Sequence, residues 1–247
     1  MANILSWDLA IFLVGTLAAA FVTGLAGFAF GMVAASVWLF ALTPSQTSAL
    51  IVAYGLLVQG YAVWNLRYAI RLHRLAPFIV GSAIGIPAGI AALRWISPAH
   101  FRIGVGVLLI IFSLYNLVRP KLPQMKAAGR CADAAVGFFN GALGSATGLA
   151  GILPTIWSGL RGWPRDEQRA VFQPTAVATF LMAIVAFGRV GIITLDTVRL
   201  FMIGLPTLVA GSWLGWMLYG KLDESAFRKV VLVLLLVSGV TLVASGR

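Results

Sequence analysis

The chain alternates long apolar runs with short polar connections, and most of the runs have the length of a membrane-spanning helix. A helix needs about 20 apolar residues to cross about 30 Å of hydrocarbon. The runs that meet this requirement are residues 48–66, 75–93, 101–118, 170–188, 198–218 and 226–244. We therefore predict an all-α polytopic membrane protein.

Two further apolar runs, residues 9–42 and 132–160, are too long for a single span. Glycines interrupt both runs, and glycine lets the backbone leave helical geometry. In hydrocarbon an interrupted backbone is tolerated only where protein or a water-filled cavity covers it. We predict that each run forms a helical hairpin that is broken at its glycines and that enters and leaves the membrane on the same side.

The composition excludes other classes of protein. Apolar residues make up 60% of the chain and charged residues 10%, whereas soluble domains have about 45–50% and about 25%. The excess of cations, a net charge of +11, lies in the short loops. There it indicates topology determinants and lipid contacts, not nucleic-acid binding. The single cysteine, Cys131, excludes an internal disulfide and provides no metal-ligand cluster.

Two glycine patterns each occur twice. Segment 21–31, Phe-x-x-Gly-x-x-Gly-x-x-x-Gly, matches segment 138–148 at a constant offset of 117 residues. Segment 85–102, with Gly-x-x-x-Gly followed by Phe-Arg, matches segment 211–228 at an offset of 126. Such self-similarity indicates a duplicated architecture. We predict a first membrane repeat at residues 1–118, a linker at residues 119–130 with two prolines, and a second repeat at residues 131–247.

The loop charges predict how the repeats are related. If both long runs are hairpins, the loops at 67–74, 119–130, 161–169 and 221–229 share one side and carry 13 of the 18 Lys and Arg residues. If all runs cross fully, the bias almost disappears. The positive-inside rule favours the hairpins. We therefore predict inverted-topology repeats, each with a glycine-broken hairpin and three transmembrane helices, a cytoplasmic linker and both termini outside the cytoplasm.

We expect the candidate site between the two glycine-rich breaks. A helix that restarts at a break presents unpaired N–H groups and a positive dipole end, which attract an anion. We predict a backbone cradle, neutral side-chain donors and one attracting cation: Gly24, Gly27, Gly141, Gly144 and Gly148; Thr23, Gln59, Asn140, Ser145 and Gln173; and Arg169. Alternatively, the glycines serve close helix packing, the amides join neighbouring helices, and the arginine extends to lipid headgroups.

Several chemistries lack their residues. The seven carboxylates are expected at span ends or in loops, so the sequence shows no buried acid for a proton relay. Both histidines, His73 and His100, also fall in loops, which argues against an intramembrane serine protease. A Gly-Lys-Ser/Thr phosphate loop is missing, so ATP hydrolysis is not expected. We predict that the protein is not an enzyme.

The duplicated glycine pattern, followed by Pro44 in one half and Pro164 in the other, resembles the TauE/SafE sulfite exporter family, also called the toluene sulfonate uptake permease family. The resemblance implies a bacterial inner-membrane transporter of sulfite, sulfonates or related small anions, without a cofactor. The first break departs from the family pattern, because it reads Phe28-Ala29-Phe30-Gly31 without a following proline. This departure leaves an organic sulfonate or a carboxylate-like anion open as substrate.

Two other functions remain open from the sequence. One is a passive anion channel or uniporter, and the other is a membrane scaffold for a partner complex, in which the glycines serve packing only. Paired polar breaks at membrane depth favour alternating-access transport over a scaffold. The expected partners are a small anionic substrate and the lipid bilayer, without nucleic acid. The sequence leaves a homo-oligomer open.

Overall fold

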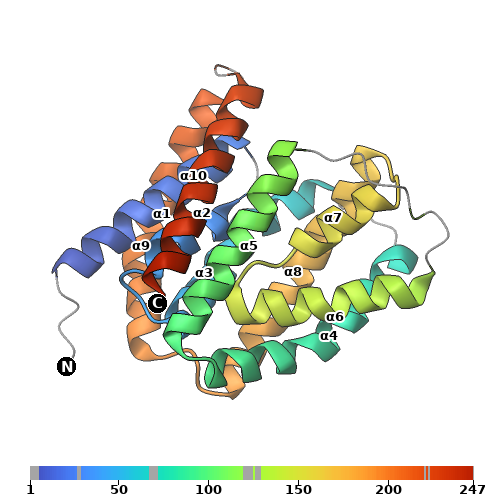
Figure 1. Cartoon of the computed structure of the whole chain (residues 1–247), viewed down its shortest axis with the longest axis horizontal. Helices are drawn as coiled ribbons and strands as arrows, with labels where there is room; N and C mark the ends of the chain where they lie inside the picture. Colours follow the sequence, from blue (N-terminus) through green and yellow to red (C-terminus); the bar gives the residue numbers. More distant parts are fainter. Residues whose placement is uncertain are drawn as a thin grey trace. The chain divides into compact units, whose positions relative to one another are not determined.

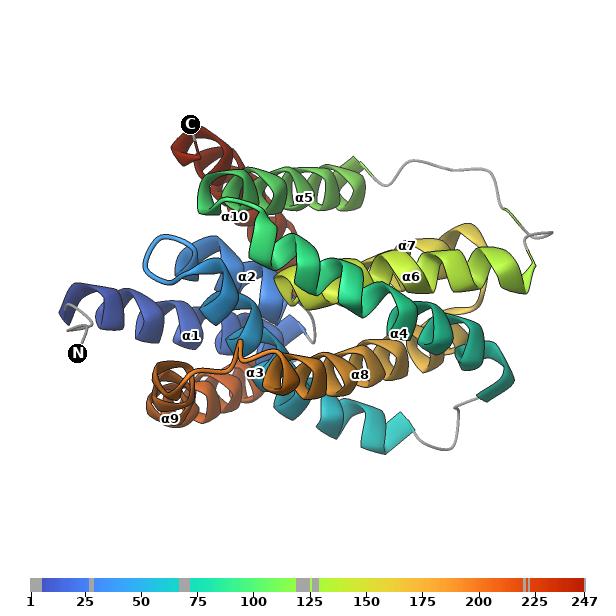
Figure 2. The ribbon, with the colours of Figure 1, turned by 90° about the horizontal axis from the view of Figure 1, so that it is seen from below.

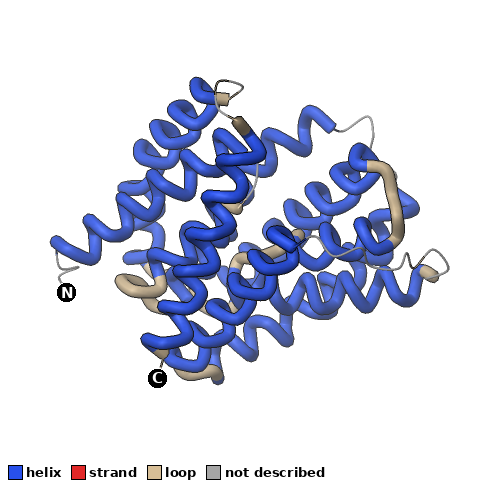
Figure 3. Tube along the Cα trace, turned by 45° about the horizontal axis from the view of Figure 1, so that its top comes forward, coloured by secondary structure: helices blue, strands red, loops and turns tan. Residues whose placement is uncertain are grey.

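The computed structural model describes residues 6–26, 29–66, 72–118, 125, 129–219, 221 and 223–246. These residues form helices and loops and contain no strand, as Figure 3 shows. The helices are α1 (Ser6–Ala26), α2 (Phe30–Trp38), α3 (Pro44–Leu66), α4 (Leu72–Trp95), α5 (Pro98–Val118), α6 (Arg130–Thr147), α7 (Ile152–Leu160), α8 (Arg165–Arg189), α9 (Leu195–Leu218) and α10 (Glu224–Ser245). The predicted all-α class is confirmed.

Within the described residues, six helical segments are long and apolar enough to cross a membrane: Trp7–Leu25, Leu72–Trp95, Pro98–Val118, Glu167–Arg189, Leu195–Leu218 and Ala226–Ser245. The last five match runs that the sequence predicts as spans, and the first overlaps the run 9–42. Helix α3 covers the predicted run 48–66, but part of its side chains lies outside the described residues. The set is consistent with a polytopic membrane protein.

Both long apolar runs are interrupted where their glycines predict. Helix α1 ends at Ala26 and α2 begins at Phe30, while α6 ends at Thr147 and α7 begins at Ile152. Helices α2 and α7 have nine residues each, which makes each about 14 Å long at 1.5 Å per residue. The two runs are therefore long helices followed by short ones, and the predicted breaks are confirmed.

In each hairpin the short helix doubles back along the long one. The indole Nε1 of Trp38, near the end of α2, donates a hydrogen bond of 3.1 Å to the carbonyl oxygen of Phe12 in α1. Their ring centroids are 5.1 Å apart. In the second hairpin, Nε1 of Trp157 in α7 donates to Oδ1 of Asp133, in the first turn of α6, at 2.7 Å. A tryptophan thus joins the two arms of each hairpin.

The chain forms two compact units, each built from both halves of the sequence. One unit comprises residues 1–47, 96–120 and 194–247, and the other comprises residues 48–95 and 121–193. In the first unit α1 packs along α9, and in the second α6 packs along α4 (Figures 1 and 2). The hairpin of one half therefore packs on a helix of the other half. The division into repeats 1–118 and 131–247 concerns sequence similarity and stays a prediction.

Glycines allow α4 and α6 to touch backbone to backbone. A Cβ atom at Gly85 of α4 would overlap the carbonyl oxygen of Phe138, and one at Gly141 of α6 would overlap that of Ser82. The first unit repeats this contact, because a Cβ at Gly24 of α1 would overlap the carbonyl oxygen of Ser212 in α9. Small residues at such crossings are typical of helix packing in membranes. The duplicated glycine patterns therefore pack against each other.

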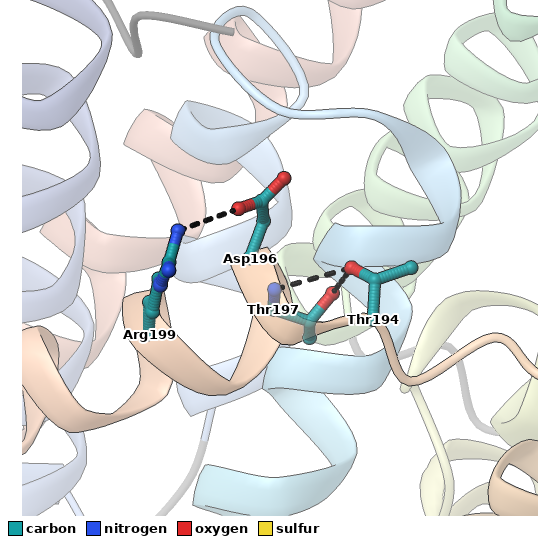
Figure 4. Close-up of polar contacts among 4 residues, drawn as sticks. All are labelled: Thr194, Asp196, Thr197 and Arg199. Carbon is teal, nitrogen blue, oxygen red and sulfur yellow. Dashed lines mark hydrogen bonds and ion pairs between the residues drawn. The ribbon is translucent and has the colours of Figure 1, made fainter. Parts of the chain in front are cut away.

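Helix α9 begins at a side-chain cap that Figure 4 shows. Thr194 is the N-cap, and its Oγ1 accepts a hydrogen bond of 3.3 Å from the backbone N–H of Thr197. The carboxylate of Asp196 lies in the positively polarised first turn and pairs with Arg199 at 3.5 Å. A capping oxygen and an acid in the first turn both stabilise a helix start. They fix where α9 begins after the loop that follows α8.

We predict that Gly141→Ala weakens the α4–α6 contact. The backbone fixes the position of the new methyl group, which overlaps the backbone of Ser82. The free energy of unfolding should therefore fall by about 1–3 kcal/mol. Gly104→Ala is the matched control, because a Cβ at this position in α5 meets nothing within 4 Å. It should be neutral or slightly stabilising. Unfolding in detergent measures the stability of both variants. Equal effects of Gly141→Ala and Gly104→Ala would contradict the packing role of Gly141.

The first break places an alanine in left-handed backbone geometry. Ala29, the N-cap of α2, has φ 75°, a conformation that glycine adopts without steric cost. We predict that Ala29→Gly raises the free energy of unfolding by about 1 kcal/mol. The reverse change in the second hairpin, Gly148→Ala at φ 75°, should lower it. Thermal unfolding in detergent compares the two variants. A lower stability of the Ala29→Gly protein would contradict a backbone strain at Ala29.

Candidate functional site

The second break, between α6 and α7, depends on two glycines in left-handed conformation. Gly148 has φ 75° and ends α6, with its N–H donating to the carbonyl oxygen of Gly144 at 2.8 Å. Gly151 has φ 94° and is the N-cap of α7. Residues with a side chain rarely adopt this geometry. Gly148 and Gly151 therefore allow the chain to reverse direction within four residues.

The side chain of Asn140 ties the two arms together at this break. Its Oδ1 accepts a hydrogen bond of 2.7 Å from the backbone N–H of Gly151. Its Nδ2 donates to Oγ1 of Thr179 at 3.1 Å and to Oγ of Ser82 at 3.3 Å. Asn140 is fully buried, and both amide protons and the carbonyl oxygen are engaged. The residue that the sequence predicts as an anion donor holds the geometry of the break.

The neighbouring hydroxyl groups also bond within the protein. Ser145 Oγ lies 2.7 Å from the carbonyl oxygen of Gly141 and 3.1 Å from that of Ile86 in α4. Thr147 Oγ1 donates to the carbonyl oxygen of Leu143 at 2.7 Å and accepts from the N–H of Leu149 at 3.2 Å. These hydroxyls satisfy the backbone at the end of α6, which an interrupted helix in hydrocarbon requires.

Helix α8 passes beside the break and carries buried polar atoms without a partner. A Cβ at Gly151 would lie 3.2 Å from Cβ of Ala176. One residue earlier, Thr175 is fully buried, and its Oγ1 has no hydrogen-bond partner. Oε1 of Gln173 is also buried and without a partner. A buried polar atom left unsatisfied costs about 1–3 kcal/mol, so these two atoms require an explanation.

The start of α7 adds backbone donors at the same place. The first N–H groups of a helix have no acceptor within that helix. Pro154 in the first turn has no N–H, and the N–H of Gly151 binds Asn140. Ile152 and Leu153 are the first-turn positions whose N–H groups remain at the positive end of the dipole. Donor groups from α7 and a hydroxyl from α8 thus occur close to one break.

In the second unit, the predicted site residues divide into three groups. Asn140, Gly141, Gly144, Ser145 and Gly148 gather at the end of α6, where they form packing contacts and the break. Gln173 is half-buried on α8 and Gln59 is half-buried on α3. Arg169, one helical turn before Gln173, is exposed. Arg169 therefore does not share the buried surroundings of Gln173.

In the first unit, the predicted residues show fewer polar groups. Thr23 is buried, and its Oγ1 donates to the carbonyl oxygen of Ala19 at 2.8 Å. Gly24 lies at the backbone contact with α9. Gly27 lies outside the described residues.

Sequence reasoning missed three residues around this break, namely Ser82, Thr175 and Thr179. Thr179 donates to the carbonyl oxygen of Thr175 at 2.8 Å and accepts from Asn140, which also bonds Ser82. Thr175 and Thr179 are one helical turn apart, so they share a face of α8. Two hydroxyls on one face of an apolar helix are the sequence signal that would have identified Thr175 beside Gln173.

The expectation that no carboxylate is buried is wrong for Asp133. This residue is 6% exposed, although it lies in the first turn of α6 as its sequence position suggests. The returning helix α7 covers it, and Trp157 donates to its Oδ1. Burial at a helix end depends on the neighbouring arm, which the position in sequence does not reveal. The described part of the chain has no group of three or more His, Cys, Asp or Glu that could hold a metal ion.

Comparison with known proteins identifies the family from the whole sequence. No curated protein and no solved structure matches the chain. The family model described as "Sulfite exporter TauE/SafE" matches residues 11–242, a range that reaches from α1 into α10. The chain therefore belongs to the sulfite exporter TauE/SafE family of membrane transporters.

Proposed function

We propose that this protein transports a small sulfur-containing anion, such as sulfite or an organic sulfonate, by alternating access around its broken hairpins. The family match supports transport of this class of substrate. The order of helices supports a duplicated architecture, because each half has a long helix, a short helix and three long helices. The loop charges favour inverted repeats with both termini outside the cytoplasm. The family resemblance implies that this membrane is the bacterial inner membrane.

One observation carries this proposal: two buried polar atoms without a partner, Thr175 Oγ1 and Gln173 Oε1, lie on the helix that packs against the broken hairpin. A bound anion would satisfy the Thr175 hydroxyl, and Gln173, two residues earlier and on another side of α8, would meet the anion at a second position. The Thr175 hydroxyl donates to an oxyanion directly, and the Gln173 carboxamide presents its NH2 group after a 180° rotation, which exchanges two atoms of similar size. Neutral donors hold an anion without burying a permanent cation.

The proposed site gives the predicted residues different roles. Thr175 and the start of α7 contact the anion, and Gln173, which faces another side of α8, contributes to the substrate path. Asn140, Gly141, Gly144, Ser145 and Gly148 maintain the break that presents these groups. Thr23, Gly24, Gly27, Gln59 and Arg169 remain predictions of the sequence for a contribution to the substrate path. The anion is therefore bound chiefly by groups of the second hairpin and α8.

Flux measurements distinguish this proposal from its alternatives. Purified protein in liposomes should give saturable flux of sulfite, thiosulfate or sulfoacetate, while small carboxylates test the breadth of the substrate class. Accumulation against a concentration gradient under an imposed proton or sodium gradient would exclude a passive channel or uniporter. Absence of any specific anion flux from correctly folded protein would support the scaffold alternative and overturn the proposal.

We predict that Thr175→Val separates function from stability. Valine keeps the shape of threonine but removes an unsatisfied buried hydroxyl, so the unfolding temperature without ligand should stay the same or rise. Anion flux should fall at least about tenfold, since a lost hydrogen bond to an anion is worth about 1.5–3 kcal/mol. Gln173→Leu should act in the same direction. Flux in proteoliposomes and thermal unfolding in detergent provide the two measurements.

Thr179→Val is the matched control on the same face of α8. Its hydroxyl is also fully buried but makes two hydrogen bonds, so its loss leaves Asn140 with an unsatisfied donor. This variant should unfold at a lower temperature. If Thr175→Val were as unstable as Thr179→Val, or kept full flux, the assignment of Thr175 to the anion would be wrong.

A further inference from the structure

A groove of about 710 Å³ runs between α4 and α8 in the second unit. Its walls are apolar side chains, among them Ile86 and Ile90 of α4 and Leu181 and Val185 of α8. Arg94 and Arg189 line its end, and none of the described residues that line it is acidic. Its volume lies within the range of sites that hold small molecules. The groove thus combines an apolar wall with positive charge at one end.

Arg94 and Arg189 lie in the last turns of their helices. A cation there also compensates the negative end of the helix dipole. The guanidinium of Arg94 donates to the carbonyl oxygen of Val190, the C-cap of α8. This bond holds Arg94 toward α8, and a guanidinium has five N–H donors. The remaining donors of Arg94, and those of Arg189, are exposed at the groove.

Trp95 indicates the depth of this end of the groove in the membrane. It is the last residue of α4, lines the groove and is 88% exposed. Tryptophan is enriched at membrane–water interfaces, where its ring meets the headgroups. Since α4 and α8 are both candidate spans, their common end lies at the headgroups and the apolar part of the groove lies beside the acyl chains.

We propose that this groove binds an anionic phospholipid. The phosphate contacts Arg94 and Arg189, and one acyl chain lies along Ile86, Ile90 and Val185. Arginine binds phosphate through paired, charge-assisted hydrogen bonds. A choline headgroup brings a cation close to two others, which disfavours phosphatidylcholine. The site therefore selects lipid by charge, and it does not depend on which anion is transported.

The experiment measures thermal unfolding of the delipidated full-length protein in neutral detergent. Short-chain phosphatidylglycerol should raise the unfolding temperature more than phosphatidylcholine of the same chain length, because a ligand of the folded state stabilises it. Inorganic phosphate should produce no comparable shift, because it lacks the acyl chain. In the double variant Arg94→Gln, Arg189→Gln, the apparent affinity for phosphatidylglycerol should fall by at least about tenfold.

Two further variants make the result specific. Ala91→Phe places a large side chain in the groove without changing its charge, since Ala91 is exposed there, and it should also weaken phosphatidylglycerol binding. Arg199→Gln removes an exposed arginine of α9 that is outside the groove and paired with Asp196. This control should keep the preference of the unaltered protein for phosphatidylglycerol over phosphatidylcholine.

Several results would overturn the proposal. One is equal stabilisation by both lipids, and another is an equal shift with inorganic phosphate alone. A third is a preference for phosphatidylglycerol over phosphatidylcholine that survives in Ala91→Phe. This variant also tests the site if the double arginine variant does not fold. Loss of the preference in Arg199→Gln would show a general effect of surface charge and would also refute the site.

Discussion

The backbone contact between α4 and α6 is the constraint from which the site follows. Glycines at the crossing bring Ser82 of α4 within hydrogen-bond reach of Asn140 on α6. Asn140 in turn binds Thr179 of α8 and the N–H of Gly151 at the start of α7. A larger residue at Gly141 would separate α4 from α6 and with it the side chains that hold the break. Packing and polar bonding therefore support each other here.

The sequence predicted the breaks but not the partners of the glycines. Glycine spacing locates an interrupted helix because left-handed backbone geometry favours glycine, as at Gly148 and Gly151. The same spacing also suits a close helix crossing, so it does not distinguish Gly141, which packs, from Gly148, which turns. It contains no information on which helix lies opposite. The packing of α4 on α6 and of α9 on α1 became visible only with the structure.

Other parts of the site depended on contacts that sequence does not contain. Asn140 and Ser145 are polar residues beside a break, and this position alone is compatible with a ligand contact or with capping. The structure places both in capping and packing bonds. Ala29 adopts φ 75° without being glycine, so no residue type marked the start of α2. Asp133 is buried only because α7 folds back over it.

The polarity of the second break has a consequence for how an anion is held. The first turn of α2 is apolar, and its buried side chains include Phe30 and Met32. The second break is surrounded by satisfied amide and hydroxyl groups, whereas Thr175 Oγ1 and Gln173 Oε1 on the neighbouring α8 have no hydrogen-bond partner. At Thr175, an apolar side chain of the same shape would remove the free-energy cost of the unsatisfied hydroxyl. Natural sequences depart from full hydrogen bonding chiefly at functional sites, and this departure occurs next to the positive end of α7.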